Sequence, residues 1–196
     1  MLTFALAVFF LIITPGPGVL STAGVGASFG GRAGLRYVSG LFVGTNLVGL
    51  TVISGLAALV LADPRLRVVL FTLSFGYLAY LAFRIAFAGS KLAFIQRASP
   101  PGLSGGILLQ VMNPKAYAVN TALYTGFGFL PDSYWTEVLA KFVIMNLIWV
   151  PIHLLWLWAG ITVHQLNLSP RAHSIINKAM AASMMIVVIL AALELV

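Results

Sequence analysis

Residues 11–20 read LIITPGPGVL, with two prolines and two glycines near the middle of an apolar run from residue 2 to residue 29. A run of this length can cross a bilayer as a helix, which takes about 20 mostly apolar residues. Proline removes a backbone N–H and clashes with the preceding turn, so we expect the helix to break at Pro15 and Pro17. The segment therefore predicts two half-helices in series, broken near the centre of the membrane.

The composition of the whole chain also predicts a membrane protein. Hydrophobic residues make up 61% of the 196 residues and charged residues only 8%, against about 25% charged residues in an ordinary soluble domain. These values exclude a soluble globule and a disordered chain. Cysteine is absent, which excludes a disulfide scaffold and a thiolate metal site. With three histidines and four acidic residues, we expect neither a metal nor another cofactor.

Six segments are apolar enough to span a bilayer, and they predict an all-α integral membrane protein with one transmembrane domain over residues 1–196. The segments cover residues 2–29, 35–62, 66–88, 104–130, 137–163 and 172–195. The net charge of +7 is then explained by loop Lys and Arg residues, and no nucleic-acid partner is expected.

The distribution of Lys and Arg predicts the orientation of the chain. The loops after the first, third and fifth spans hold seven of these residues, namely Arg32, Arg36, Arg84, Lys91, Arg97, Arg171 and Lys178. The opposite side holds three, namely Arg65, Arg67 and Lys141. Positive residues concentrate on the cytoplasmic side, so both termini are predicted to lie outside.

The second half of the chain repeats features of the first half. Residues 41–50 read LFVGTNLVGL and residues 141–150 read KFVIMNLIWV, so that Asn46 recurs as Asn146 at an offset of 100. Four of these ten positions match, which is weak evidence by itself.

A second break strengthens the repeat, because Pro114 follows Pro15 by 99 residues. Three spans in each half give the halves opposite topology. We therefore predict a 3+3 inverted repeat with helices one and four broken, made of repeat one (about 1–90), a cytoplasmic linker (about 89–103) and repeat two (about 104–196). Inverted repeats with helices interrupted at matching places are typical of secondary transporters.

The two breaks predict a binding site for a zwitterion. Thr14 and Asn113 are good N-cap residues, and each precedes a proline, the favoured first residue of a helix. Such a helix start attracts anions, and Lys115 adds a full positive charge at membrane depth. We expect these groups to bind a carboxylate, and freed carbonyls with Asn46 and Asn146 to bind an ammonium. The predicted substrate-binding residues are Thr14, Pro15, Gly16, Pro17, Gly18, Asn46, Asn113, Pro114, Lys115 and Asn146.

Several of these residues also have a purely structural interpretation. One proline in a membrane helix is most often a kink, although two at repeat-related places favour a site. The amides of Asn46 and Asn146 serve equally well to hold two helices together. His153 is either a proton relay or a hydrogen-bonded packing residue.

Short motifs lie in order along nearly the whole chain: TPGP at 14–17, GRAGL at 31–35, Gly40-xxx-Gly44, GYLAYL at 76–81 followed by Arg84, and NPKA at 113–116. Together they resemble the lysine exporter (LysE/RhtB) family of amino-acid exporters. The resemblance implies a multi-pass protein of the bacterial inner membrane that exports amino acids or close derivatives, driven by the proton gradient. It implies a small amino-acid-like solute, the lipid bilayer and protons as partners, and leaves a homodimer open.

The chain departs from the family at the acidic positions. Gly18 stands where the family usually has Asn or Asp, and Thr45-Asn46 stand where members often carry an acid. Without a carboxylate at the midplane, Lys115 and His153 are the candidates for proton coupling. The same absence argues against a dibasic substrate, whose second ammonium needs a partner, and predicts a neutral amino acid.

Other functions are less well supported by the sequence. A metal-ion exporter of the same superfamily would need clustered His and acidic residues. A membrane enzyme would need a nucleophile–base pair or a metal cluster, and His153 has no acid at its depth, so no enzyme is predicted. A channel-like or structural subunit is also disfavoured. A channel would need a symmetric polar ring formed by an oligomer, whereas this sequence has an inverted repeat within one chain.

Overall fold

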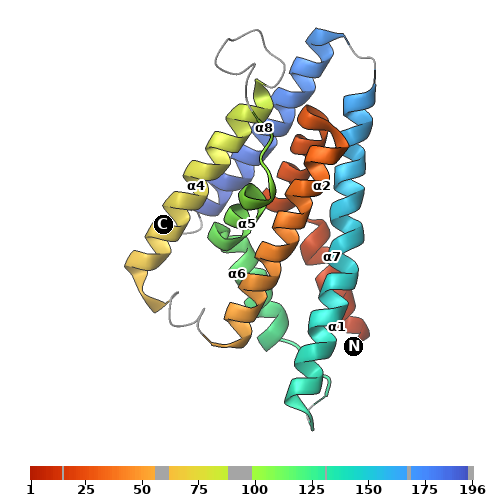
Figure 1. The fold of residues 1–196 in the computed structure, drawn as a ribbon. Helices are drawn as coiled ribbons and strands as arrows, with labels where there is room; N and C mark the ends of the chain where they lie inside the picture. Colours follow the sequence, from red (N-terminus) through yellow and green to blue (C-terminus); the bar gives the residue numbers. More distant parts are fainter. Residues whose placement is uncertain (15, 56–61, 88–98, 131, 167–168, 194–196) are drawn as a thin grey trace.

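The structure is a computed structural model that describes residues 1–196 except residues 15, 56–61, 88–98, 131, 167–168 and 194–196. Among the described residues every regular element is a helix and there is no strand, which confirms the all-α prediction. The helices are α1 (Leu2–Ile13), α2 (Pro17–Ile53), α4 (Pro64–Ala86), α5 (Leu103–Met112), α6 (Pro114–Thr125), α7 (Tyr134–Gln165) and α8 (Pro170–Leu193). Figure 1 shows them as one elongated bundle, with α2 between α7 and the α4–α8 pair.

Helix α2 is sharply bent rather than straight. Gly30 has φ 77° and ψ −177°, so two helical arms, residues 17–29 and 31–53, meet at this one residue. This backbone region is accessible essentially only to glycine. The sequence predicted a loop before residue 35, whereas the second arm already begins at Gly31, because a single glycine is sufficient to turn the chain.

The remaining helices agree with the predicted spans. Helices α4, α7 and α8 begin and end within about three residues of the predicted segments, and α5 and α6 together form the predicted broken helix four. The second arm of α2 ends at Ile53, short of the predicted residue 62, and residues 56–61 lie outside the described part. Among the described helices, two are by length and composition apolar enough to cross a membrane, over Pro17–Ile53 and Tyr134–Val163.

Glycines bring the backbones of α2, α5 and α7 into close contact. A β-carbon on Gly40 would collide with the carbonyl oxygen of Leu103, and one on Gly160 would collide with that of Ala23. A β-carbon on Gly44 would lie 2.9 Å from the carbonyl oxygen of Ile107. Small residues at helix contacts are the means by which membrane helices pack closely. The central position of α2 therefore depends on the small residues along it.

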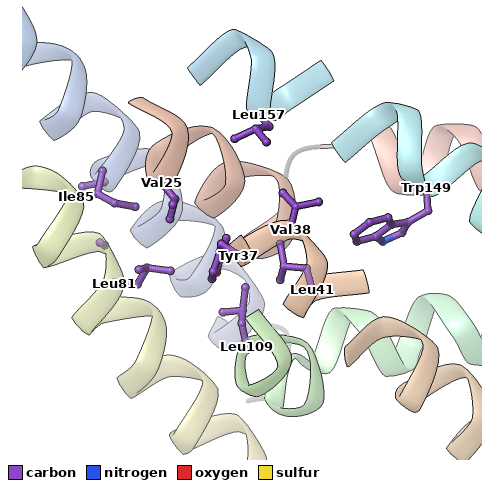
Figure 2. Close-up of a cluster of buried hydrophobic side chains, with 11 residues drawn as sticks. Val25, Tyr37, Val38, Leu41, Leu81, Ile85, Leu109, Trp149 and Leu157 are labelled. Atoms are coloured by element: carbon purple, nitrogen blue, oxygen red, sulfur yellow. The ribbon is translucent and has the colours of Figure 1, made fainter. Parts of the chain in front are cut away.

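A cluster of buried apolar side chains surrounds the bend of α2, as Figure 2 shows. Tyr37 lies at its centre, fully buried, and its hydroxyl donates a hydrogen bond to Oγ of Ser21 over 3.0 Å. This bond joins the two arms of α2 to each other. A second, smaller cluster around Phe4, Val8 and Leu123 packs α1 against α6.

The outer surface of the bundle is strongly apolar. On α7 alone, large apolar side chains such as Leu147 and Trp158 are more than 60% exposed. Contiguous apolar surface of this kind would be unfavourable in water. It is suited to contact with lipid chains.

Candidate binding site at the helix breaks

The first break separates α1 from α2. Helix α1 ends at Ile13, Thr14 caps its C-terminus, and α2 starts at Pro17 with Gly16 as its N-cap. The prediction that Thr14 is the N-cap of the second half-helix is therefore wrong. A residue before proline is driven out of the helical region, and both Thr14 (ψ 125°) and Gly16 (ψ 179°) precede one. The helix can restart only at the second proline.

The second break, between α5 and α6, follows the prediction. Asn113 has ψ 108° and its Oδ1 accepts a hydrogen bond from the backbone N–H of Lys115 over 3.1 Å. Pro114 is the first residue of α6. The two breaks thus differ, because α6 has a side-chain cap whereas Gly16 offers none to α2. The start of α2 keeps its positive helix end open to a ligand.

Lys115 connects the two breaks. Its Nζ donates a hydrogen bond to the carbonyl oxygen of Thr14 over 3.1 Å, although the residues are 101 positions apart. The same Nζ lies 2.9 Å from the place that a β-carbon on Gly16 would occupy. The ammonium of α6 therefore stands directly at the uncapped start of α2. Two sources of positive potential act on one place, which is favourable for an anion.

His153 reaches the same turn from α7. It is only 3% exposed, and its Nδ1 lies 3.0 Å from the carbonyl oxygen of Trp149. The imidazole stacks on the Trp149 ring, with 3.5 Å between ring centroids. Its Nε2 lies 3.5 Å from the position of a β-carbon on Gly18. Because a carbonyl only accepts, Nδ1 carries the proton in the neutral ring and Nε2 presents a lone pair.

Gln110 is a polar residue of the site that the sequence analysis did not identify. It is only 5% exposed, and its Oε1 accepts a hydrogen bond from Nδ2 of Asn113 over 3.0 Å. Within the part of the chain that the structure describes, its amide nitrogen has no partner. The sequence feature that could have identified it is a glutamine one helical turn before Asn113, in a helix of mostly apolar and small residues.

Asn46 and Asn146 form a reciprocal pair between α2 and α7. Each Nδ2 donates to the other's Oδ1, over 3.1 and 2.9 Å, and also to the carbonyl oxygen four residues earlier. Both hydrogens of each amide are thereby used. Only the second lone pair of each Oδ1 is left for a ligand, so the pair joins two helices and offers acceptors alone.

These groups line one cavity between α1, α2, α5, α6 and α7. Of the predicted site residues, the cavity is lined by Thr14, Gly16, Pro17, Gly18, Asn46, Asn113, Lys115, Asn146 and His153. Pro114 does not line it, and Pro15 lies outside the described residues. Gln110, Asn120 and Tyr124 add polar groups, and an apolar part is formed by Leu11, Ile12, Val19, Val119, Phe142, Met145 and Trp149. No Asp or Glu is among the lining residues that the structure describes.

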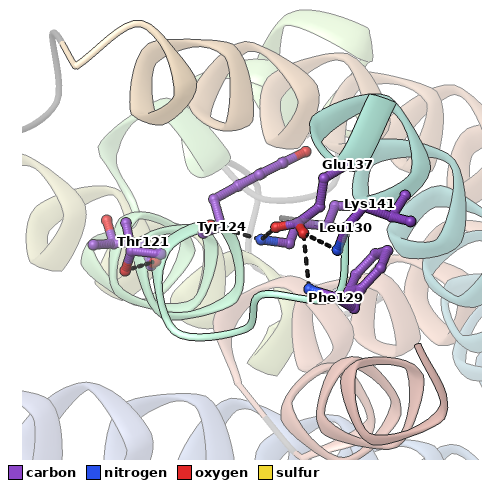
Figure 3. Close-up of polar contacts among 7 residues, drawn as sticks. Thr121, Tyr124, Phe129, Leu130, Glu137 and Lys141 are labelled. Atoms are coloured by element: carbon purple, nitrogen blue, oxygen red, sulfur yellow. Dashed lines mark hydrogen bonds and ion pairs between the residues drawn. The ribbon is translucent and has the colours of Figure 1, made fainter. Parts of the chain in front are cut away.

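A charged network lies beside Tyr124, which is one of the lining residues of the cavity (Figure 3). Lys141 is 3% exposed, forms an ion pair of 2.7 Å with Glu137, and donates to the carbonyl oxygen of Tyr124 over 2.9 Å. Oε2 of Glu137 accepts hydrogen bonds from the backbone N–H groups of Phe129 and Leu130. The network fastens the α6–α7 loop to α7. Lys141 was counted on the outer side for the orientation, and it lies within α7, as it does within the predicted span 137–163.

Comparisons with known proteins supply independent information. The family model of the LysE type translocators matches residues 9–195. An uncharacterized membrane protein of Pseudomonas aeruginosa is 37% identical over 79 residues, which cover 40% of this chain and 37% of that protein.

A leucine efflux protein of Enterobacter sp. strain 638 is 25% identical over 130 residues, which cover 64% of this chain and 62% of that protein. The matched part thus spans less than two thirds of either relative. No solved structure matches.

Proposed function

This chain belongs to the family of LysE-type translocators, which are membrane proteins, and from that premise we propose that it is a secondary transporter that exports an amino acid or a close derivative. The observation that carries the proposal is the contact of Lys115 with Thr14 and Gly16, because it joins both helix breaks at one cavity. A transport role agrees with the expectation that the chain is not an enzyme.

The substrate carboxylate binds at the start of α2. Backbone N–H groups of its first turn and the Lys115 ammonium supply the positive charge, and Gly16 lets the Lys115 side chain lie directly against the backbone at this place. The buried amide nitrogen of Gln110 is a further donor at this place. These groups form the anion-binding arrangement that a broken membrane helix offers to a carboxylate.

The substrate side chain is neutral. The cavity wall is apolar along Leu11, Val19, Val119, Met145 and Trp149. The described lining has no carboxylate that would stabilise a second ammonium, and Lys115 would repel one. The name of the leucine efflux relative agrees with this class, and we expect leucine or a similar amino acid to be transported.

Transport follows from movement of the two halves of the chain around this site. We propose that repeat one and repeat two, with three spans each, form a single transmembrane domain in a bacterial inner membrane with both termini outside. The matched helix breaks support this arrangement, as do Asn46 and Asn146, which make the same bond to the residue four positions earlier. Protons drive export, and Lys115 and His153 are the two candidates for the residue that couples them to the substrate.

The proposal is tested by counterflow in proteoliposomes that contain the purified protein. Vesicles are loaded with one unlabelled amino acid, and the entry of labelled leucine, lysine or leucinamide is measured without any ion gradient. We expect leucine to enter, lysine to enter poorly, and leucinamide, which has no carboxylate, not to enter. Equal transport of leucine and leucinamide would contradict the carboxylate site, and no counterflow of any amino acid would contradict the function.

A further inference from the structure

We propose that Nε2 of His153 accepts a hydrogen bond from the ammonium of the substrate. A proton and the substrate then compete for this one lone pair, and the competition couples their movements. This inference rests on the proposed amino-acid export. It assigns the residue through which the proton acts and a reason why the exchange is obligatory. Lys115, in contrast, keeps its charge and binds the carboxylate.

Two contacts with Trp149 fix the orientation of the His153 imidazole ring. Nδ1 is held by the carbonyl oxygen of Trp149, and stacking on Trp149 fixes the plane of the ring. The lone pair at Nε2 therefore has one direction, toward Gly18 on α2. No partner of Nε2 is present among the described residues, although the side chain is 97% covered. His153 lines the cavity, so an acceptor there that has no protein partner is available to a ligand or to water.

The spacing suits an α-amino acid. Lys115 Nζ lies beside Gly16 and His153 Nε2 lies beside Gly18, at 2.9 and 3.5 Å from the respective β-carbon positions. Residues two apart in a chain are separated by at most about 7 Å. The carboxylate and ammonium of an α-amino acid are joined through one carbon atom. Lys115 Nζ and His153 Nε2 thus face neighbouring positions of one glycine turn, where the proposal places the carboxylate and the ammonium of one molecule.

Among the polar groups that the described residues place around the glycine turn, His153 is the hydrogen-bond acceptor that can bind a proton. On α5, the nearest polar group is Oε1 of Gln110, which is 3.8 Å from the same Gly18 position and cannot ionise near neutral pH. The first arm of α2 contributes no titratable lining residue. On α6, Lys115 is a cation and Tyr124 lies beside Gly49, away from the glycine turn. No acid among the described lining residues competes with His153 for the proton.

Competition for the lone pair couples the movement of the proton to the movement of the substrate. A proton from water on the side where substrate leaves binds Nε2 and converts the imidazole to imidazolium. The imidazolium can no longer accept from an ammonium and repels it, so the substrate is released. On the opposite side the proton returns to water, the lone pair is restored, and the next substrate binds. One proton moves inward for each zwitterion that moves outward.

The test separates transport from coupling by means of His153→Gln, which retains a polar side chain but does not bind a proton near neutral pH. Leucine, or the neutral amino acid that counterflow identifies, is measured both in counterflow and in accumulation driven by a pH gradient. We expect wild type to do both. His153→Gln alters the ammonium site itself, so its counterflow should fall, and the counterflow that remains should not depend on pH and should give no accumulation. Accumulation by His153→Gln at the wild-type level would overturn the proposal, whereas failure of wild-type counterflow would overturn the proposed function instead.

A measurement on the unmodified protein guards against misfolding of the variant. The apparent affinity for leucine is measured from pH 8 to pH 4, together with that for its 2-hydroxy analogue, which has a hydroxyl in place of the ammonium. Competition by one proton predicts that leucine affinity falls up to about tenfold per pH unit at the acidic end, and that binding at this pH releases about one proton. The hydroxy acid should release none. Equal proton release by both ligands, or release by neither, would overturn the proposal.

Discussion

At the scale of single residues, the function of the site depends on two glycines that a sequence pattern cannot distinguish from structural ones. Gly16 and Gly18 occupy the first turn of α2, where Lys115 and His153 approach the backbone. Neither has a positive φ, so any residue can adopt their backbone conformation. Because they have no side chains, Lys115 can approach the backbone at Gly16 and His153 can approach it at Gly18.

Replacing Gly16 tests this interpretation. The β-carbon of Gly16→Ala would lie 2.9 Å from Lys115 Nζ, the end of a flexible side chain that can move away. We therefore expect the melting temperature in detergent to change by only a few degrees, because only the flexible Lys115 side chain has to move. Counterflow should fall at least tenfold, since the ammonium is displaced. Unchanged counterflow would show that this place is not occupied by substrate.

The residue scale also shows where sequence reasoning reached its limit. Asn113 was predicted as an N-cap because its role depends only on its immediate neighbours. Thr14 was assigned incorrectly because Pro15 and Pro17 compete to start the helix. Gln110 was not identified because its role depends on the contact of α5 with α2, which no local pattern reports.

At the scale of elements, the bend of α2 is the feature that the hydrophobic pattern could not predict. The run of apolar residues indicates two spans but not how they are joined. Gly30 joins them without a loop because its backbone lies in the region reserved for glycine. The bond between Tyr37 and Ser21 then holds the two arms together. The position of the start of α2 relative to α7 follows from this corner.

We expect Gly30→Ala to destabilise the protein by about 1–3 kcal/mol, the cost of forcing a β-carbon into this backbone region. Thermal unfolding in detergent, compared with Gly76→Ala, measures the loss. Gly76 is a suitable control because it lies in α4 and a β-carbon there meets no atom within 4 Å. A melting temperature of Gly30→Ala equal to that of the control would contradict the strained corner.

The ion pair of Lys141 and Glu137 gives a second prediction at this scale. Lys141 is buried and Glu137 is partly exposed, so removing Glu137 leaves a buried ammonium without its ion pair, whereas replacing both residues with neutral groups removes that charge. We expect Glu137→Gln alone to lower the melting temperature more than the double variant Glu137→Gln/Lys141→Met. The measurement is a double-mutant cycle of thermal unfolding. Additive effects would mean that the two side chains do not act as a pair.

At the scale of the whole molecule, the predicted spans agree with the helices. How the two halves contact each other depends on packing between helices, which the sequence does not predict. The sequence identified Asn46 and Asn146 as equivalent positions of a repeat, and the structure brings them together as a mutual pair. Their correspondence was readable from the offset of 100 residues. Their contact was not, because it depends on the tilt of α2 against α7 and on the glycines between them.

If the halves move against each other, fixing this pair should stop transport. The chain has no cysteine, so Asn46→Cys/Asn146→Cys introduces the only two thiols. We expect a short thiol cross-linker to abolish counterflow of the double variant, and each single-cysteine variant to keep its own activity after the same treatment. Full activity of the cross-linked double variant would exclude movement of α2 against α7 at positions 46 and 146.

The central claim is that Lys115 at the uncapped start of α2 binds the carboxylate of the transported amino acid, and counterflow of leucine by Lys115→Ala tests it most directly. Lys178→Ala is the matched control, because Lys178 is an exposed lysine on α8. We predict that Lys115→Ala is inserted and monodisperse but loses counterflow by at least a hundredfold, while Lys178→Ala transports as wild type. Counterflow by Lys115→Ala at the wild-type rate would contradict the assignment of the site.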